Sequence, residues 1–523
     1  MLANRMLTMF LFIAIFAAEF VAGFYISYFN EFMHPDALSR VANAFYVLYS
    51  RDPHLAAIGF VWNPLPSFME IIPLLFYPLF PALAYDGLSA VIVSSLFAGL
   101  NTVLLYSAGQ RYGLPGWFNL TFSLLFSLNP FIFLFGFNGL SDVPFIFFLM
   151  YTVVHFTHWM DTRHPSNLIF SGFGLALAFW TRYEAVLVGA ALAFSIVALL
   201  LAQSSSNADK LSKRWKETYF RIESSWIVLL LPAVFSGLLW LLFNKMFTGN
   251  SLYFLNSEYS NSAQSASLKT DVQFSEIFSN PLVALKICFQ KTLWFSAPLF
   301  GVLLVRVINK RLFRSDVIAI MLVFCSVPAL QFLLLLNSSS FAWFRYFMYV
   351  FPLTAAWIPY ELSKVKSSLF QYGIVICSLI VTIGLLGYAI TDPSIAPDEN
   401  TLLTFKSGQY NQSIQLDRSV AAWLDEQLPD KTILTDSASA YMIIMSSKNP
   451  RKFLITSDFE FKDAVSDPPG KSIEYILLPK PPGYSTINSK YPDMFENGSK
   501  WATLYKTFQD STNHFEWRLY QVN

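Results

Sequence analysis

The chain alternates between long apolar stretches and short polar connections. A helix of about 20 apolar residues crosses a bilayer, and eleven stretches reach or approach that length. They lie near residues 6–27, 84–107, 116–136, 142–160, 167–181, 184–202, 225–244, 288–306, 316–336, 347–363 and 368–390. This pattern predicts a mostly α-helical polytopic membrane protein of about 11 transmembrane helices.

The first apolar stretch follows Arg5 and runs from Met6 to Tyr25. A cleavable signal peptide and a retained helix are the two alternatives. We expect a retained helix, because the stretch is long enough to span and no small-x-small cleavage site follows it. Glu19 is then expected to face other helices rather than lipid.

A long first outer loop, about 28–83, separates the first two predicted spans. Leu38, Val41, Phe45, Leu48 and Tyr49 recur there at helical spacing, which predicts an amphipathic helix in the membrane interface. The apolar segment 64–80 is broken by Pro66, Pro73 and Pro78. We expect short juxtamembrane helices there, since a further span would move the later basic connections to the outer side.

Apolar periodicity shortens after Thr391, where charge and proline content rise. Helices are expected at 419–427 and 459–465, and strands at 432–435, 453–456, 473–478, 503–507 and 515–522. The chain is therefore divided into a transmembrane domain, 1–390, and a soluble α/β domain, 391–523.

Composition supports membrane insertion and argues against one class of ligand. The hydrophobic fraction is 54% and the charged fraction only 13%, against roughly 25% charged residues in soluble domains. The formal net charge of +1 argues against nucleic acid as a ligand.

Basic residues set the expected orientation. Arg5, Arg111, Arg163 and the basic clusters at 210–221, 306–314 and 364–366 fall on one side if the spans alternate. That side is predicted to be cytoplasmic. The N-terminus is then cytoplasmic and residues 391–523 are periplasmic or extracellular, with a bacterial inner (plasma) membrane as the default location.

Asp36 is the leading candidate for catalysis. It follows the first predicted span and opens the amphipathic helix of the outer loop. An aspartate at this position is also a good helix N-cap. The two roles are compatible, because a cap fixes the side chain while one carboxylate oxygen stays available.

Two arginines interrupt apolar sequence on the same predicted side. Arg182 lies in a turn between spans five and six, and Arg345 precedes Tyr346 at the start of another span. Each has a structural alternative, as an interfacial anchor or, for Arg182, as a partner of Glu184. Together they suggest a phosphate site, because a guanidinium binds phosphate oxygens bidentately and keeps its charge.

Other polar residues are weaker candidates for lining the same cleft. Asp142 opens a span on the outer side and is equally well explained as a helix cap. Glu184, beside Arg182, is another candidate, and the remaining ones share the first outer loop: Arg40, His54, Asn63 and Glu70. The sequence has no zinc-ligand spacing, Walker loop, GxGxxG or GxSxG, so no cofactor is required and divalent-metal dependence stays open.

The layout resembles the GT-C superfamily of integral-membrane glycosyltransferases. It is most similar to the family of protein O-mannosyltransferases and bacterial aminoarabinose transferases. The resemblance is carried by Asp36 after the first span, the Asn63-Pro64-Leu65 corner, Asp142, Arg182 and Arg345-Tyr346, together with the outer C-terminal domain. Three departures leave the sugar, the acceptor and the metal requirement open: Asp36-Ala37 replaces Asp-Glu, Asn63 replaces a lysine, and Arg182 replaces another lysine.

The resemblance implies a hexosyltransferase that moves a sugar, with inversion, from a polyprenyl-phosphate carrier to an acceptor hydroxyl on the outer side. Asp36 would be the general base, and Arg182, Arg345 and Tyr346 would hold the lipid phosphate. The acceptor would be a lipid, a glycan or a protein. The alternative is a transporter or flippase for a lipid-linked or small polar substrate, although such proteins usually show related halves and polar residues near the bilayer midplane.

Overall fold

The computed structural model describes residues 2–523 except 205–210, 258, 266–271, 366–367, 405–408, 482–484 and 511–513. Lys210 and Lys366 of the predicted basic clusters lie outside the described residues. Contacts divide the chain into two compact units. The helical unit comprises Met1–Glu19, Ser94–Phe137 and Ser141–Leu403, and the mixed unit comprises Phe20–Val93, Asn138–Leu140 and Thr404–Asn523. The predicted division at residue 390 stays a prediction.

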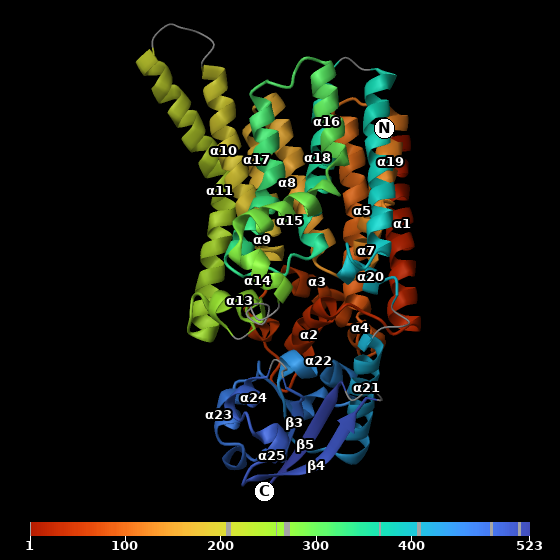
Figure 1. Ribbon diagram of the computed structural model, residues 1–523, viewed down its shortest axis with the longest axis vertical. Helices are drawn as coiled ribbons and strands as arrows, with labels where there is room; N and C mark the ends of the chain where they lie inside the picture. Colours follow the sequence, from red (N-terminus) through yellow and green to blue (C-terminus); the bar gives the residue numbers. More distant parts are fainter. Residues whose placement is uncertain are drawn as a thin grey trace. The chain divides into compact units, whose positions relative to one another are not determined.

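Long helices make up most of the helical unit (Figure 1). Two of them, α1 (Leu2–Phe24) and α5 (Leu88–Arg111), also extend into the mixed unit. The others are α6 (Gly116–Ser127), α7 (Pro130–Phe137), α8 (Asp142–Thr162), α9 (Pro165–Thr181), α10 (Ala185–Ser204), α11 (Leu211–Thr248), α15 (Pro281–Leu293), α16 (Ala297–Ile308), α17 (Asp316–Leu336), α18 (Val350–Ser363) and α19 (Leu369–Thr391). Shorter helical segments are α12 (Tyr253–Asn256), α13 (Asn261–Ser265), α14 (Val272–Ser279), η4 (Phe344–Phe347) and α20 (Pro397–Thr401).

The prediction of a mostly helical polytopic protein is confirmed. Within the described ranges, seven helices are long and apolar enough to cross a membrane, or nine if each of two bent pairs is one span. Helices α9 and α18 also lie where spans are predicted, but they have only 17 and 14 residues. The number of eleven spans therefore stays a prediction.

The two bent pairs break where prolines restart a helix. The axes of α6 and α7 differ by 64°, and those of α15 and α16 by 78°. At the first break, the Asn129 side chain accepts a hydrogen bond of 3.0 Å from the Phe131 N–H, directly before Pro130 begins α7. Proline suits the first turn of a helix, where its missing N–H would have no intrahelical partner.

Gly136 of α7 lies directly against the end of the Glu19 side chain. The Glu19 side chain is fully buried, as expected for a residue that faces other helices. A Cβ atom added at Gly136 of α7 would lie 2.3 Å from the Glu19 Oε1 atom. Glycine at this position therefore allows α1 and α7 to approach each other.

A buried ion cluster joins α16, α17 and α18. Arg306 and Arg311 each pair with Asp316 and Glu361; the Arg311 Nη1 atom lies 3.0 Å from the Glu361 Oε1 atom. Two cations meet two anions, so the charges of the two arginines are balanced within the cluster. The basic excess used to orient the chain is carried in the connection between α16 and α17 by Lys310 and Arg314.

The amphipathic helix of the first outer loop forms as α2 (Pro35–Tyr49) in the mixed unit. Its apolar residues Leu38, Val41 and Phe45 are buried. They pack within protein, because α2 contacts η2 (Leu55–Ile58), α3 (Leu65–Leu74), α4 (Ala82–Tyr85) and α22 (Ser437–Ser446). The amphipathic pattern predicted the helix correctly, but here its apolar face is covered by other helices.

The C-terminal part of the mixed unit is the predicted α/β fold. Its strands are β1 (Ile433–Leu434), β2 (Phe453–Leu454), β3 (Tyr475–Pro479), β4 (Ala502–Gln509) and β5 (Glu516–Val522). They form one sheet in the order β2-β1-β3-β5-β4, parallel from β2 to β3 and antiparallel from β3 to β4. The remaining helical segments of this unit are η1 (Tyr25–Phe29), α21 (Gln409–Gln427), η6 (Pro450–Lys452), α23 (Phe461–Ser466), η7 (Pro469–Lys471), α24 (Thr486–Lys490) and α25 (Met494–Asn497).

Polar contacts tie the first outer loop to this fold within the mixed unit. Arg418 of α21 pairs with Asp86 and with Glu31, whose Oε1 atom lies 3.1 Å from the Arg418 Nη1 atom. The Tyr46 hydroxyl donates a hydrogen bond of 3.2 Å to the Ser437 carbonyl. The carboxylate of Asp458 accepts hydrogen bonds from the backbone N–H groups of Ile455 and Asp52.

Asp458 predicts a pH dependence of stability. Burial raises the pKa of this carboxyl from an ordinary value of 3.8 to about 6. The folded state then binds the proton more tightly than the unfolded state, so stability falls as pH rises from about 4 to 6. We expect Asp458→Asn to remove a change on the order of 2 kcal/mol in the free energy of unfolding across this range. Chemical denaturation of the purified protein at pH 4 and 7 measures it, with the exposed Asp430→Asn as control. An unchanged pH profile in Asp458→Asn would show that this carboxyl is not the titrating group.

Candidate functional site

Arg182 is held between two carboxylates at the end of α9. Its Nη1 atom lies 2.9 Å from the Asp142 Oδ1 atom, and its Nη2 atom lies 2.7 Å from the Glu184 Oε1 atom. A third bond of 3.1 Å runs from Nε to the same Glu184 oxygen. The structure therefore shows the pair of Arg182 with Glu184 that was the structural alternative for this arginine, and it adds Asp142 to that pair.

Tyr349 completes this cluster, and sequence reasoning missed it. Its hydroxyl donates a hydrogen bond of 2.8 Å to the Asp142 Oδ1 atom, and its side chain is fully buried. Asp142 is the first residue of α8 and Ser141 is its N-cap. The Asp142 carboxylate thus pairs with Arg182 and accepts a hydrogen bond from Tyr349. A role as a helix cap does not account for these contacts.

Arg345 and Tyr346 lie beside the same cluster, in η4. The Arg345 guanidinium stacks over the Trp343 ring at 4.3 Å, and its Nη1 atom lies 2.8 Å from the Asp398 Oδ2 atom. The Tyr346 ring centroid lies 5.8 Å from the guanidinium carbon of Arg345 and 5.8 Å from that of Arg182. The two predicted phosphate-binding arginines thus meet around one tyrosine.

Two carboxylates of α20 were also missed. Asp398 pairs with Arg345, and the neighbouring Glu399 is buried. Burial, with the Asp398 charge adding to it, raises the pKa of Glu399 to about 7. The signal in the sequence was two consecutive acids after a proline, directly beyond the last span, on the side predicted to hold the site.

Asp36 lies in the first turn of α2, in the mixed unit. The N-cap of that helix is His34, whose ring nitrogen accepts a hydrogen bond of 3.1 Å from the Asp36 N–H. The interpretation of Asp36 as the N-cap is therefore wrong. Its carboxylate lies 3.9 Å from the His34 ring nitrogen, and its side chain is 49% exposed. Asp36 stays a predicted catalytic residue, and about half of its side-chain surface is accessible to solvent.

Three other loop candidates gather next to α2. The Arg40 Nη1 atom donates a hydrogen bond of 3.1 Å to the Asn63 carbonyl, and the Ser67 hydroxyl donates to the Arg40 carbonyl at 3.0 Å. Glu70 is fully buried on α3, and burial raises the pKa of its carboxyl well above its ordinary value, although the Arg40 charge opposes this. Arg40, Asn63 and Glu70 therefore form a local group that fixes α2 against α3.

His54 belongs to a different contact. Its ring stacks on Phe459 with 4.5 Å between centroids, and its Nδ1 atom lies 2.6 Å from the Asp52 carbonyl. This histidine joins the first loop to the C-terminal fold. It is not brought to the group around Arg40.

The described residues contain no group of three or more histidine, cysteine, aspartate or glutamate side chains arranged to hold a metal ion. In the Arg182 cluster, the cation between the two carboxylates is the guanidinium itself.

Comparison with known families places these residues in context. Residues 73–218 match the family model of dolichyl-phosphate-mannose-protein mannosyltransferases. The family resemblance is confirmed. The match implies a membrane glycosyltransferase, and it includes Asp142, Arg182 and Glu184. Asp36 and Arg345 lie outside the matched segment, and no curated protein matches the chain.

The Arg182 cluster makes a prediction about stability. Arg182→Met keeps the side-chain volume but leaves two carboxylates without their cation, at an expected cost of about 3–5 kcal/mol. Tyr349→Phe removes a single hydrogen bond and should cost only about 1 kcal/mol. Thermal unfolding of the detergent-purified variants measures both effects. Equal losses in the two variants would contradict the central role of the arginine.

Proposed function

We propose that the protein transfers a sugar from a polyprenyl-phosphate carrier to an acceptor hydroxyl on the outer side of the membrane, with inversion at the anomeric carbon. The observation that carries this proposal is the convergence of Arg182 and Arg345 on Tyr346. Two guanidinium groups around one aromatic ring suit a phosphate, whose oxygens accept paired N–H bonds. The family match supports the glycosyltransferase reaction.

The two arginines are expected to act differently toward the phosphate. Three of the five N–H groups of Arg182 bond to Asp142 and Glu184, so two are left by count. These bonds also fix the guanidinium plane, so Arg182 would be a preorganised donor. Arg345 pairs with Asp398, which is 22% exposed and lies on a short helix. Asp398 is an anion that a phosphate would displace.

Asp36 is proposed as the general base. Its carboxylate would take the proton of the acceptor hydroxyl as that oxygen bonds to the anomeric carbon. The bond between this carbon and the phosphate oxygen breaks, and the polyprenyl phosphate leaves with the electron pair. The arginines stabilise the charge that grows on the departing phosphate, a contribution worth about 2.7–4 kcal/mol per donor in other enzymes.

Arg345 and Asp398 test the phosphate site. We expect Arg345→Gln to weaken polyprenyl-phosphate binding by roughly tenfold or more, since a charge-assisted hydrogen bond is lost. Asp398→Asn should strengthen binding several-fold, because the competing anion is removed. Titration of the purified protein measures both, with Asp392→Asn on the same connection as control. Binding indifferent to both substitutions would refute a phosphate site at Arg345.

Asp36 tests the chemical step. Loss of a general base typically lowers the rate by roughly 10²–10⁴-fold, so Asp36→Asn should abolish most release of polyprenyl phosphate from lipid-linked sugars. The matched control is Asp52→Asn, a carboxamide substitution on the same outer loop. Protein yield and unfolding temperature should be unchanged in both variants. Undiminished turnover in Asp36→Asn would remove this residue from the mechanism.

A further inference from the structure

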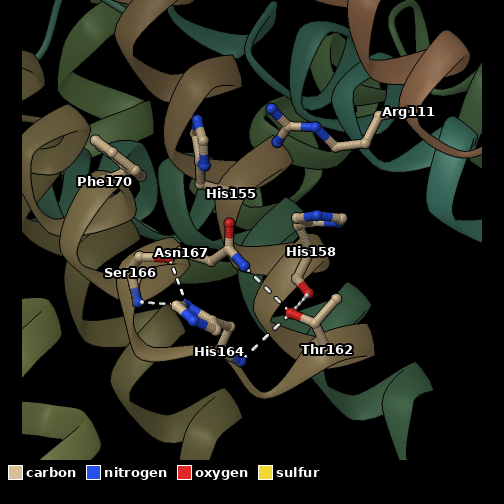
Figure 2. Close-up of a pocket in the computed structure, with 8 residues that line it drawn as sticks. All are labelled: Arg111, His155, His158, Thr162, His164, Ser166, Asn167 and Phe170. Carbon is tan, nitrogen blue, oxygen red and sulfur yellow. Dashed lines mark hydrogen bonds between the residues drawn. The ribbon is translucent and has the colours of Figure 1, made fainter.

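A pocket lies at the turn between α8 and α9, in the helical unit (Figure 2). Its cavity volume is about 430 Å³. Arg111, the last residue of α5, lines it together with seven residues of the turn and its flanking helices: His155, His158, Thr162, His164, Ser166, Asn167 and Phe170. None of the eight carries a carboxylate, and Arg111 supplies a permanent positive charge.

Hydrogen bonds fix the walls of this pocket. The His164 ring nitrogen accepts a bond from the Ser166 N–H and thereby caps α9. The Thr162 hydroxyl donates to the His158 carbonyl at 2.9 Å and accepts from the Asn167 amide at 3.2 Å. The turn is therefore a built structure, and Figure 2 shows these bonds around the pocket.

Two imidazoles that line the pocket each have one ring nitrogen without a hydrogen-bond partner among the described residues. His155 and His158 lie three residues apart on α8 and hence on the same face. The Nδ1 atom of each is buried and has no hydrogen-bond partner within the described residues. The His155 side chain is itself only 8% exposed. A buried polar atom without a partner costs free energy, which a ligand at this position would recover.

We infer that this pocket binds a phosphate ester, in the form of an anionic lipid head group. Arg111 and the imidazole N–H groups are donors for phosphate oxygens, and the positive end of the α9 dipole faces the same space. The neighbouring acid, Asp161, pairs with Lys364. Phe170 is 46% exposed and gives the pocket an apolar edge suited to an acyl chain. Basic pockets between transmembrane helices on the cytoplasmic side are a known type of phospholipid site.

This pocket is distinct from the proposed phosphate site at Arg182. Asp142 begins α8 and Thr162 ends it, so about 30 Å of helix separates the two places. The inference therefore stands independently of the proposed sugar transfer.

Lipid titration of the full-length purified protein tests this site. Native mass spectrometry would compare short-chain phosphatidylglycerol with phosphatidylcholine, and inorganic phosphate would be added as a competitor. We expect tighter binding of phosphatidylglycerol, weakened about fivefold by Arg111→Gln and similarly by His158→Gln. Lys310→Gln is the matched control, since it removes an exposed charge from a connection on the same predicted side.

The outcomes separate two sources of phosphate. Competition by inorganic phosphate together with a preference for phosphatidylglycerol would support the lipid head group. Binding of inorganic phosphate that depends on Arg111, without any lipid preference, would overturn the lipid assignment in favour of a soluble phosphate compound. Equal binding of both lipids and no effect of phosphate would overturn the site altogether. Competition uses the unaltered protein, so this result does not depend on the folding of any variant.

Discussion

The ion cluster of Arg182 with Asp142 and Glu184 is the interaction on which the helical unit depends most. Asp142 begins α8, Arg182 follows α9, Glu184 precedes α10, and Tyr349 precedes α18. One guanidinium thus fixes the ends of four helices. Apolar packing between transmembrane helices is weakly directional because lipid solvates apolar side chains equally well. A buried charge that must be paired sets the register that such packing leaves undefined.

A second ion cluster shows what a purely structural arrangement looks like. Around Arg306 and Arg311, two cations meet two anions at the ends of α16, α17 and α18. Around Arg182 and Arg345, four acids meet the two arginines and Lys291, which interacts with Glu399. A phosphate entering there must displace or neutralise a carboxylate, since unscreened like charges repel strongly at short range. Asp398, which is partly exposed, and Glu399, with a pKa of about 7, are the two suited to that role.

The sequence predicts most of the helices because membrane spans can be recognised by their length and apolarity. The alternation of spans also predicts that Arg182 and Arg345 share one side, and each is noticeable because it interrupts an apolar stretch. Their partners Tyr349 and Asp398 could not be predicted. Tyr349 lies in an aromatic run with no distinguishing spacing. Asp398 lies beyond the last predicted span, and nothing in the sequence links it to Arg345. Ion pairs between distant helices depend on tertiary packing, which periodicity does not encode. The bends before α7 and α16 were not predicted either: Pro130 and Pro298 are visible in the sequence, but apolarity alone gives one continuous span.

The amphipathic pattern of α2 shows a deeper ambiguity, and its resolution bears on the role of the C-terminal fold. An apolar stripe at helical spacing is the same whether it faces lipid or protein. In the mixed unit it faces α3, α4 and α22, and Tyr46 bonds directly to Ser437 of α22. The helix that carries Asp36 is therefore held by the C-terminal fold itself. Catalytic groups must be kept within a fraction of an ångström of their working geometry, and packed helices achieve this better than loops. On this argument the C-terminal fold positions the proposed base, so a disturbance of its contacts with α2 reaches the chemistry through the position of Asp36.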